Sequence, residues 1–215
     1  MKQVLLIGLG RYGQNIAARL DELDYQVMAV DKDEKRVNEA LNLVTNAQIG
    51  DSSDPEFLKS LGISNFDYVI VGIAGDFESS MITTAMAKEL GAKKVISRAC
   101  TDIQEKLLKR NGADVVVYPE KQVARWTVNR YVSEHVLDYF DLTEDYAIYE
   151  VEIPEHWIGK SIALVDVRSK YQINILAIRE DKSLNVAMDA HTVLREGQSL
   201  LVLGKIENVR KCFKV

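Results

Sequence analysis

The stretch Val4-Leu5-Leu6-Ile7-Gly8-Leu9-Gly10-Arg11-Tyr12-Gly13 decides how this chain folds. Its apolar run predicts a buried parallel strand, and the glycines after it have the spacing G-x-G-x-x-G. Gly8 allows a tight turn, Gly10 lets a pyrophosphate approach the backbone, and Gly13 lets the following helix pack closely on the strand. The free N–H groups at the start of that helix favour an anion. Glycines in ordinary turns can also produce this pattern, so it needs support from elsewhere in the chain.

An aspartate at the end of the next apolar segment gives that support. Residues 25–30 predict a second strand, and Asp31 follows Gly13 by 18 residues, where a ribose-binding acid is expected. Its carboxylate can accept hydrogen bonds from the ribose hydroxyls and would repel a 2′-phosphate, so NADP is disfavoured. The alternative is that Asp31 caps the helix that begins just after it. The two motifs together predict an adenine-nucleotide site.

The composition is that of a globular protein and argues against several functions. The chain has 215 residues, of which 47% are hydrophobic and 27% charged, enough for one large or two small domains. Its net charge of −5 argues against a nucleic-acid partner. Cys100 and Cys212 form neither a disulfide framework nor a metal cluster, which fits a reducing cytosol. No apolar run reaches the ~20 residues that span a bilayer, so we expect no direct membrane insertion and action at a membrane only through a partner.

Strands and helices alternate regularly up to about residue 117. This alternation predicts an α/β fold with a Rossmann-like, doubly wound parallel sheet, whose ligands sit at the carboxyl ends of the strands. The strands are expected at 4–7, 25–30, 44–49, 67–72, 95–97 and 114–117, and the helices between them at 33–43, 55–61, 77–90 and 102–109.

A long helix is predicted from Pro119 to Phe140. With six strands covered on both faces by its own helices, the first domain offers nothing to cover the apolar stripe of this helix. We therefore expect the segment to be a dimer-forming arm or a bridge between domains. The stripe consists of Val123, Trp126, Val128, Tyr131, Val132, Val136 and Leu137.

The last part of the chain predicts a small α+β domain. Alternating apolar residues indicate strands at 147–153, 174–179, 193–194 and 199–203, with a short helix at 163–168 and a final helix from about 205. We place the domains at 1–135 and 136–215. The second is too small to be the substrate domain of a dehydrogenase.

Four places at predicted strand ends supply candidate binding residues, each with an ordinary structural alternative. Arg11 can reach nucleotide phosphates, or it lies on a solvated helix face. Residues 50–53 can touch the nucleotide, or they form a turn and a helix cap. Residues 72–76 lie where an adenine edge is expected, or they form a tight turn. Arg98 points toward the same rim, or it pairs with a neighbouring acid.

The sequence offers no catalytic set beside these binding residues. The histidines at 135, 156 and 191 lie away from the carboxyl ends of the predicted strands, and neither G-x-S-x-G nor H-E-x-x-H occurs. A Rossmann domain without a reacting group favours a sensor over an enzyme.

The chain resembles the cytosolic Ktr/Trk potassium-uptake regulators, which are gating-ring proteins built from the N and C domains of regulators of K⁺ conductance (RCK). The residues that carry the resemblance are Gly8 to Gly13, Asp31, Gly50 to Asp54 and Tyr118 to Lys121, followed by the small α+β domain. It covers nearly the whole chain and is strongest for the Ktr type, in which the pair of domains occurs once.

This resemblance implies a regulatory subunit without enzymatic activity. Such a subunit binds ATP and ADP, or NAD(H), and gates an integral membrane potassium channel or transporter. It forms homodimers that assemble into an octameric ring. Its location is cytoplasmic, at the inner face of the cell membrane, where the membrane partner holds it.

The family's nucleotide site can be carried over position by position. The resemblance implies that Arg11 and Arg98 hold phosphates and that Asp31 holds the ribose. It implies that Glu120 faces the neighbouring subunit's nucleotide and helps to hold a divalent cation (Mg²⁺ or Ca²⁺) or sodium, whereas the sequence alone favours a helix acid stabilised by the dipole. The full expected set is Gly8, Gly10, Arg11, Tyr12, Gly13, Asp31, Lys32, Asp51, Ser52, Ile73, Ala74, Arg98 and Glu120.

A second ligand is implied for the small domain. In many family members this domain dimerises and binds cyclic di-AMP between subunits. The corresponding positions are Val165, Val167, Arg168, Asn174 and Ile175, which would also suit a plain subunit interface.

Two other functions stay open at this point. An NAD-dependent oxidoreductase would need a proton-transfer residue and a substrate pocket, and the sequence supplies neither clearly. A nucleotide-sensing module unrelated to transport would share the first domain. One departure from the family pattern is Asp76, which adds a negative charge near the expected adenine pocket.

Overall fold

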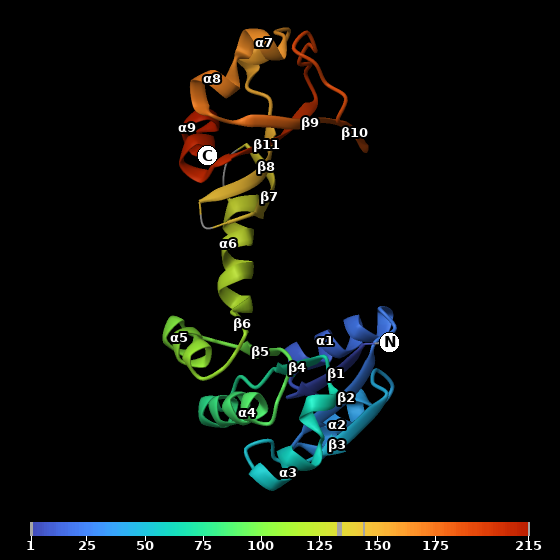
Figure 1. Ribbon diagram of the computed structural model, residues 1–215. Coiled ribbons are helices and arrows are strands. Elements are labelled where there is room, and N and C mark those ends of the chain that lie inside the picture. Colours follow the sequence, from blue (N-terminus) through green and yellow to red (C-terminus); the bar gives the residue numbers. More distant parts are fainter. Residues whose placement is uncertain (1, 133–134, 144, 215) are drawn as a thin grey trace. The chain divides into compact units, whose positions relative to one another are not determined.

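The computed structural model describes residues 2–132, 135–143 and 145–214. The chain divides into two compact units, Met1–Lys121 and Gln122–Val215, each with its own sheet and core (Figure 1). Helix α6 (Pro119–Tyr131) runs through this division. The domain boundary after residue 135 therefore stays a prediction.

The first unit is built on a six-stranded sheet in the order β3-β2-β1-β4-β5-β6. All five neighbouring pairs are parallel, which confirms the predicted doubly wound fold. The chain reverses its direction of winding between β1 and β4, and such a switch point leaves a crevice at the carboxyl ends of the strands. The strands are β1 (Gln3–Ile7), β2 (Gln26–Asp31), β3 (Asn46–Ile49), β4 (Tyr68–Val71), β5 (Val95–Arg98) and β6 (Val115–Val117).

Helices cover the two faces of this sheet unequally. On one face, α1 and α2 pack against Val4 and Leu6; on the other, α3 and α4 pack against Leu5 and Ile7, and α5 packs on α4. Because both faces of β1 are buried, its residues Val4 to Ile7 are all apolar. The helices are α1 (Arg11–Glu22), α2 (Glu34–Ala40), α3 (Pro55–Ser60), α4 (Phe77–Glu89) and α5 (Asp102–Arg110), with a 3₁₀ turn η1 (Ile63–Asn65).

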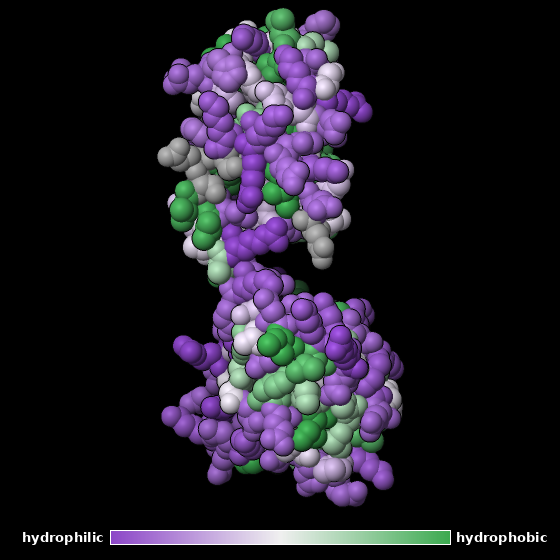
Figure 2. Space-filling model, turned by 90° about the vertical axis from the view of Figure 1, so that its left-hand side faces the viewer, coloured by the Kyte–Doolittle hydropathy of each residue, from purple (hydrophilic) through white to green (hydrophobic). Residues whose placement is uncertain are grey.

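The expectation that helices clad both faces was wrong over β5 and β6. Right-handed crossovers place α4 and α5 on the same face as α3, so the opposite face there keeps half-buried Ile96 and Val117 and exposed Val115. Helix α5 also exposes Ile103 and Leu107. This part of the unit, on the left of Figure 1, faces the viewer in Figure 2, where apolar side chains form a patch on the first unit.

The predicted helix 119–140 was wrong beyond Tyr131. Helix α6 ends there, and β7 (Val136–Asp141) follows, paired antiparallel with β8 (Tyr146–Glu152). His135, immediately before β7, has a φ of 67°, which a right-handed helix does not allow. Val136 is buried in the core of the second unit, whereas the rest of the stripe on α6 has no buried side chain. The two apolar positions 136 and 137 lie on opposite faces of a strand and not on one helical face.

The second unit contains a five-stranded antiparallel sheet in the order β10-β9-β11-β8-β7. Its remaining strands are β9 (Asn174–Glu180), β10 (Ser183–Asn185) and β11 (Gln198–Lys205). The predicted strand at 193–194 is only a single bridge from Val193 to Ser161. The predicted helix at 163–168 is two short helices, α7 (Ile162–Val165) and α8 (Val167–Tyr171), divided at Asp166 with a φ of 50°.

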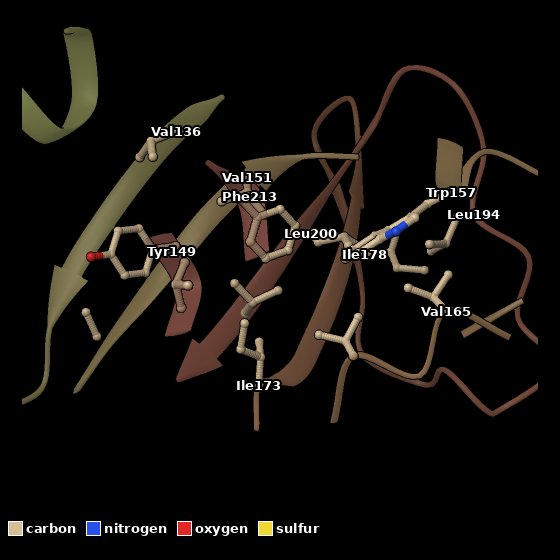
Figure 3. Close-up of a cluster of buried hydrophobic side chains, with 14 of the residues drawn as sticks. Val136, Tyr149, Val151, Trp157, Val165, Ile173, Ile178, Leu194, Leu200 and Phe213 are labelled. Carbon is tan, nitrogen blue, oxygen red and sulfur yellow. The ribbon is translucent and has the colours of Figure 1, made fainter. Parts of the chain in front are cut away.

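A hydrophobic core of aliphatic and aromatic side chains holds the second unit together. Figure 3 shows Tyr149, Trp157 and Phe213 among the buried side chains, contributed by β8, the 3₁₀ turn η2 (Glu155–Trp157) and the last helix α9 (Ile206–Phe213). The rings of Trp157 and Phe213 meet edge to face with centroids 5.3 Å apart. Such contacts add to the energy of burial. Among the described residues, no helix has the length and apolar character needed to cross a membrane.

Gly13 provides a test of the predicted close contact between helix and strand. A Cβ on this residue would lie 1.9 Å from the carbonyl oxygen of Gly8, so the glycine loop would have to move. We expect Gly13→Ala to lower the free energy of unfolding by about 1–3 kcal/mol in urea denaturation, as overpacked sites do. The matched control is Gly10→Ala, because a Cβ there meets no atom within 4 Å. Equal stability of the two variants would contradict the assignment.

Candidate functional site

A cleft of about 730 Å³ lies where the sheet of the first unit changes its winding direction. All of the predicted nucleotide-site residues except Gly13 line it, including Arg11, Asp31, Arg98 and Glu120. Gly13 instead provides the close contact with Gly8 described above. The structure thus brings together side chains from the ends of β1, β2, β4 and β5, the loop after β3 and the start of α6.

The glycine loop has the geometry of an anion site. Gly8 has a φ of 96°, and a Cβ there would lie 3.0 Å from the amide nitrogen of Ile73, so the position requires glycine. Gly10 is the N-cap of α1, where no side chain caps the helix and the first turn has no acidic residue. The first N–H groups of α1 and the positive end of its dipole therefore remain available for an anion.

The Asp31 carboxylate lies almost entirely buried at the end of β2, with a side-chain exposure of 6%. Its Oδ2 accepts a hydrogen bond from the amide of Leu9 at 2.7 Å, and its Oδ1 accepts one from the amide of Asp33 at 2.9 Å. One carboxylate thus joins the glycine loop to the start of α2. Each oxygen retains acceptor capacity for a ribose hydroxyl. The helix cap itself is Asp33, so the alternative role suggested for Asp31 belongs to its neighbour.

Two polar side chains that line the cleft, Arg36 and Ser79, were missed in the sequence. Arg36 extends from α2, with Nη1 3.6 Å from Oδ2 of Asp31 and Nε 3.5 Å from Oδ2 of Asp33. Ser79 lines the cleft from α4 and donates its hydroxyl to Asp76. Both lie three residues after a helix-capping aspartate, and that helical spacing could have located them.

The loop after β3 supplies fewer free groups than predicted. The hydroxyls of Ser52 and Thr83 hydrogen-bond at 2.8 Å, and the Ser52 side chain is buried against α4. Asp51 accepts hydrogen bonds from the hydroxyl and the amide of Ser53, and these hold the pKa of its carboxyl below the ordinary value. Asp51 therefore reaches the rim of the cleft as a preorganised carboxylate.

Asp76 has a local role that explains part of its departure from the family pattern. It is the N-cap of α4, and the hydroxyl and amide of Ser79 hold its carboxyl pKa below the ordinary value. Lys32 lies 3.9 Å from this carboxylate and also faces the cleft. The lysine offsets the extra negative charge at this end of the site.

At the opposite end of the cleft, Arg98 is held between an aromatic ring and a carboxylate. Its guanidinium lies over the ring of Tyr12 at 5.0 Å, and its Nη2 forms an ion pair with Oε1 of Glu120. Burial raises the pKa of the Tyr12 hydroxyl. The buried Nε of Arg98 has no hydrogen-bond acceptor among the described residues. An unmatched buried N–H costs about 1–3 kcal/mol, so this end of the cleft suits an added anionic acceptor.

The described residues contain no group of three histidine, cysteine, aspartate or glutamate side chains that could hold a metal ion. Glu120 is half exposed, with one oxygen paired to Arg98. A cation bound by Glu120 would therefore need further ligands from outside these side chains.

The predicted second-ligand residues divide into buried and accessible positions. Val165 and Val167 are buried in the core of the second unit, at 5% and 3% exposure. Arg168 and Asn174 are exposed, and Ile175 is half-buried against the core. The accessible side chains alone could contact a ligand directly.

Comparison with known proteins identifies the family. The TrkA-N domain matches residues 4–119 and the TrkA-C domain matches residues 147–215. The chain is 39% identical over 210 residues to Ktr system potassium uptake protein C of Bacillus subtilis (strain 168), covering 98% of this chain and 95% of that protein. This chain belongs to the Ktr/Trk family of potassium-uptake regulators.

A second Ktr relative agrees in sequence, and a solved structure agrees in fold. Ktr system potassium uptake protein A of the same organism is 34% identical over 210 residues, covering 98% of this chain and 95% of that protein. The solved structure of the GsuK channel bound to NAD superposes with a TM-score of 0.66 at 18% identity, covering 96% of this chain and 38% of that chain. The resemblance inferred from the motifs is thereby confirmed.

The double role of the Asp31 carboxylate generates a stability prediction. Asp31→Ala removes the acceptor of the buried Leu9 amide, and we expect the free energy of unfolding to fall by about 1.5–3 kcal/mol, the range for a hydrogen bond to a charged group. The control is Asp51→Ala, whose partners lie at the exposed rim and whose effect should stay within about 0.5 kcal/mol. The interpretation fails if urea denaturation shows equal losses for the two variants.

Proposed function

We propose that this Ktr/Trk protein is a non-enzymatic regulatory subunit that binds adenine nucleotides, ATP and ADP or NAD(H), and controls a potassium-conducting membrane protein. The observation that carries the proposal is the cleft, in which the uncapped start of α1 and the buried Asp31 lie at the same switch point. Phosphates would lie near Gly10, Arg11 and Arg98, and the ribose near Asp31. The adenine would then lie by the 73–76 loop.

The ligand class is supported by the charges of the cleft. Four cationic side chains line it, Arg11, Lys32, Arg36 and Arg98, and four acidic ones, Asp31, Asp51, Asp76 and Glu120. The acidic groups occupy hydrogen bonds or ion pairs, whereas no described acidic side chain pairs with Arg11 within salt-bridge distance. A phosphate chain therefore meets an arginine at the glycine loop that no described acidic side chain neutralises.

The same contacts favour binding over hydride-transfer chemistry. Asp31 is tied to backbone amides, Asp76 caps α4 and Glu120 pairs with Arg98. No histidine or cysteine is among the residues that line the cleft. General-base catalysis requires a group placed to take a proton from a substrate, and the acidic side chains of the described lining are instead engaged by amides, hydroxyls or cationic side chains. An oxidoreductase is accordingly the weaker proposal.

Control of the membrane partner would follow from differential binding. A ligand shifts a conformational equilibrium only by the difference between its affinities for the two states. ATP and ADP differ at the phosphate end, where Arg11 and Arg98 lie. A swing from 1:99 to 99:1 requires about 5.5 kcal/mol, which several sites in one assembly can share.

Assembly into homodimers and an octameric ring is part of the proposal. Two apolar surfaces support it. Val123, Val128 and Tyr131 on α6 are more than half exposed, and the face over β5 and β6 is only partly covered. Exposed apolar surfaces of this kind mark interfaces. The ring would lie in the cytoplasm at the inner face of the membrane, held by its partner.

Cyclic di-AMP is proposed as a second ligand between two copies of the small domain. Arg168 can pair with a phosphate and Asn174 can hydrogen-bond a base, and both are exposed. Val165 and Val167 would shape the site from the core without touching the ligand.

Competition between nucleotides tests the central proposal. We expect ATP and ADP to displace one another in calorimetric titrations, with NADH and cyclic di-AMP titrated beside them. Potassium flux through the reconstituted membrane partner, and X-ray scattering of the assembly, should differ between ATP and ADP without turnover. Multi-angle light scattering should give an octamer. Identical flux and scattering with both nucleotides, or steady hydride transfer when NAD is supplied, would refute the proposal.

Glu120 is proposed to bind a cation (magnesium, calcium or sodium) together with the nucleotide phosphates of a neighbouring subunit. Glu120→Gln removes the charge that a hard cation prefers. We expect the variant to bind ATP at least as tightly as the parent but to lose the increase in melting temperature that magnesium or calcium gives the ATP-bound parent. The matched control is Glu105→Gln, an acid on α5 that pairs with Lys109 away from the cleft. An equal magnesium-dependent shift in Glu120→Gln and the parent would count against the assignment.

A further inference from the structure

Two neighbouring ion pairs connect the first turn of α6 to the rest of the first unit; each is called a tie below. They differ in their position relative to the nucleotide cleft. Glu120 pairs with Arg98 at the end of β5, and Nζ of Lys121 lies 2.6 Å from Oδ1 of Asp102 at the start of α5. Arg98 and Glu120 line the nucleotide cleft, whereas Lys121 and Asp102 lie outside it. One tie is therefore accessible to a ligand in the cleft and the other is not.

We propose that Glu120 is an internal competitor for Arg98, and that the phosphates of a bound nucleotide displace it and so release one of the two ties of α6. This inference rests on the proposed function, since it assumes that a nucleotide occupies the cleft. It assigns Glu120 a role in the ligand-free protein, separate from any cation.

Arg98 is placed to exchange one anion for another. Its side chain is 15% exposed and its guanidinium is fixed over Tyr12, so little side-chain freedom remains to be lost on binding a phosphate. The buried Nε lacks an acceptor among the described residues, so Glu120 satisfies only part of the guanidinium. A phosphate, like a carboxylate, can engage two N–H groups of an arginine at once, and a terminal phosphate carries more charge than a carboxylate.

Glu120 can leave the pair at little cost. Its side chain is 55% exposed, so a released carboxylate returns to water and is not left buried without a partner. Lys121 and Asp102, at 58% and 66% exposure, keep their own pair whether or not the cleft is filled. Occupancy of the cleft would thus remove the Glu120 tie and leave the Lys121 tie.

Competition of this kind is reciprocal. If a phosphate weakens the pair between Glu120 and Arg98, then the pair weakens phosphate binding by the same factor. Removing the Glu120 carboxylate should therefore tighten nucleotide binding. If Glu120 only contributed to binding, its removal would weaken it.

The decisive experiment compares Glu120→Gln with Lys121→Met by calorimetry in EDTA, so that no cation takes part. We expect Glu120→Gln to bind ADP and ATP about two- to fivefold more tightly than the parent, the factor for a partly exposed ion pair. Lys121→Met, which breaks the adjacent tie outside the cleft, should bind them as the parent does. Adenosine, which has no phosphate, should bind the parent and Glu120→Gln equally.

Hydrogen exchange supplies a second readout in the same proteins. Amides in the second turn of α6, which donate to the carbonyls of its first turn, should exchange faster in the parent when ADP is added, and faster in Glu120→Gln already without nucleotide. Unchanged or weaker ADP binding by Glu120→Gln would overturn the inference, as would equal tightening by Lys121→Met. If the parent binds no adenine nucleotide, the proposed function fails instead, and the two failures are distinguishable.

Discussion

The first unit depends on one hydrogen bond from a backbone amide to a buried carboxylate. Leu9 lies inside the glycine loop, and its amide donates to Asp31 across the sheet from β1 to β2. Without that acceptor, the buried N–H of Leu9 would have no described side chain to accept from it. The acid that a ribose needs is thus also the acid that the loop needs. If the ligand specificity of such a protein changed, Asp31 could be replaced only if another group accepted the hydrogen bond from the Leu9 amide.

The helices and strands of the first unit could be predicted from the sequence because several local sequence patterns indicated the same boundaries. The apolar runs, the glycine spacing and the capping aspartates all specified strands, turns and helix starts at nearly the observed positions. The segment after Tyr131 could not be predicted in the same way. Val136 and Leu137 fit a helical stripe as well as a strand, and only the pairing of β7 with β8 distinguishes them. That pairing is a tertiary contact, which spacing does not encode.

The candidate site was predictable in its outline and less so in its contacts. Asp31 and the glycines were located because their positions are fixed by the strand-to-helix turn. Ser52 was expected as a contact, yet its hydroxyl turns toward Thr83 on α4, a residue distant in sequence. Arg36 reaches the cleft because α2 begins at Glu34, which places Arg36 in its first turn, with Nη1 near Asp31. Such orientations follow from packing between elements and not from the order of residues.

The uncapped beginning of α1 has a practical consequence for work with this protein. A helix start whose amides have no capping side chain attracts small oxyanions as well as nucleotides. Inorganic phosphate or sulfate in a buffer would therefore occupy the same amides and stabilise the apparently empty protein against heat. In phosphate buffer the measured nucleotide affinity would be lower than the true one, because part of the protein already holds a buffer anion. Samples prepared in chloride salts and a zwitterionic buffer give the true reference state.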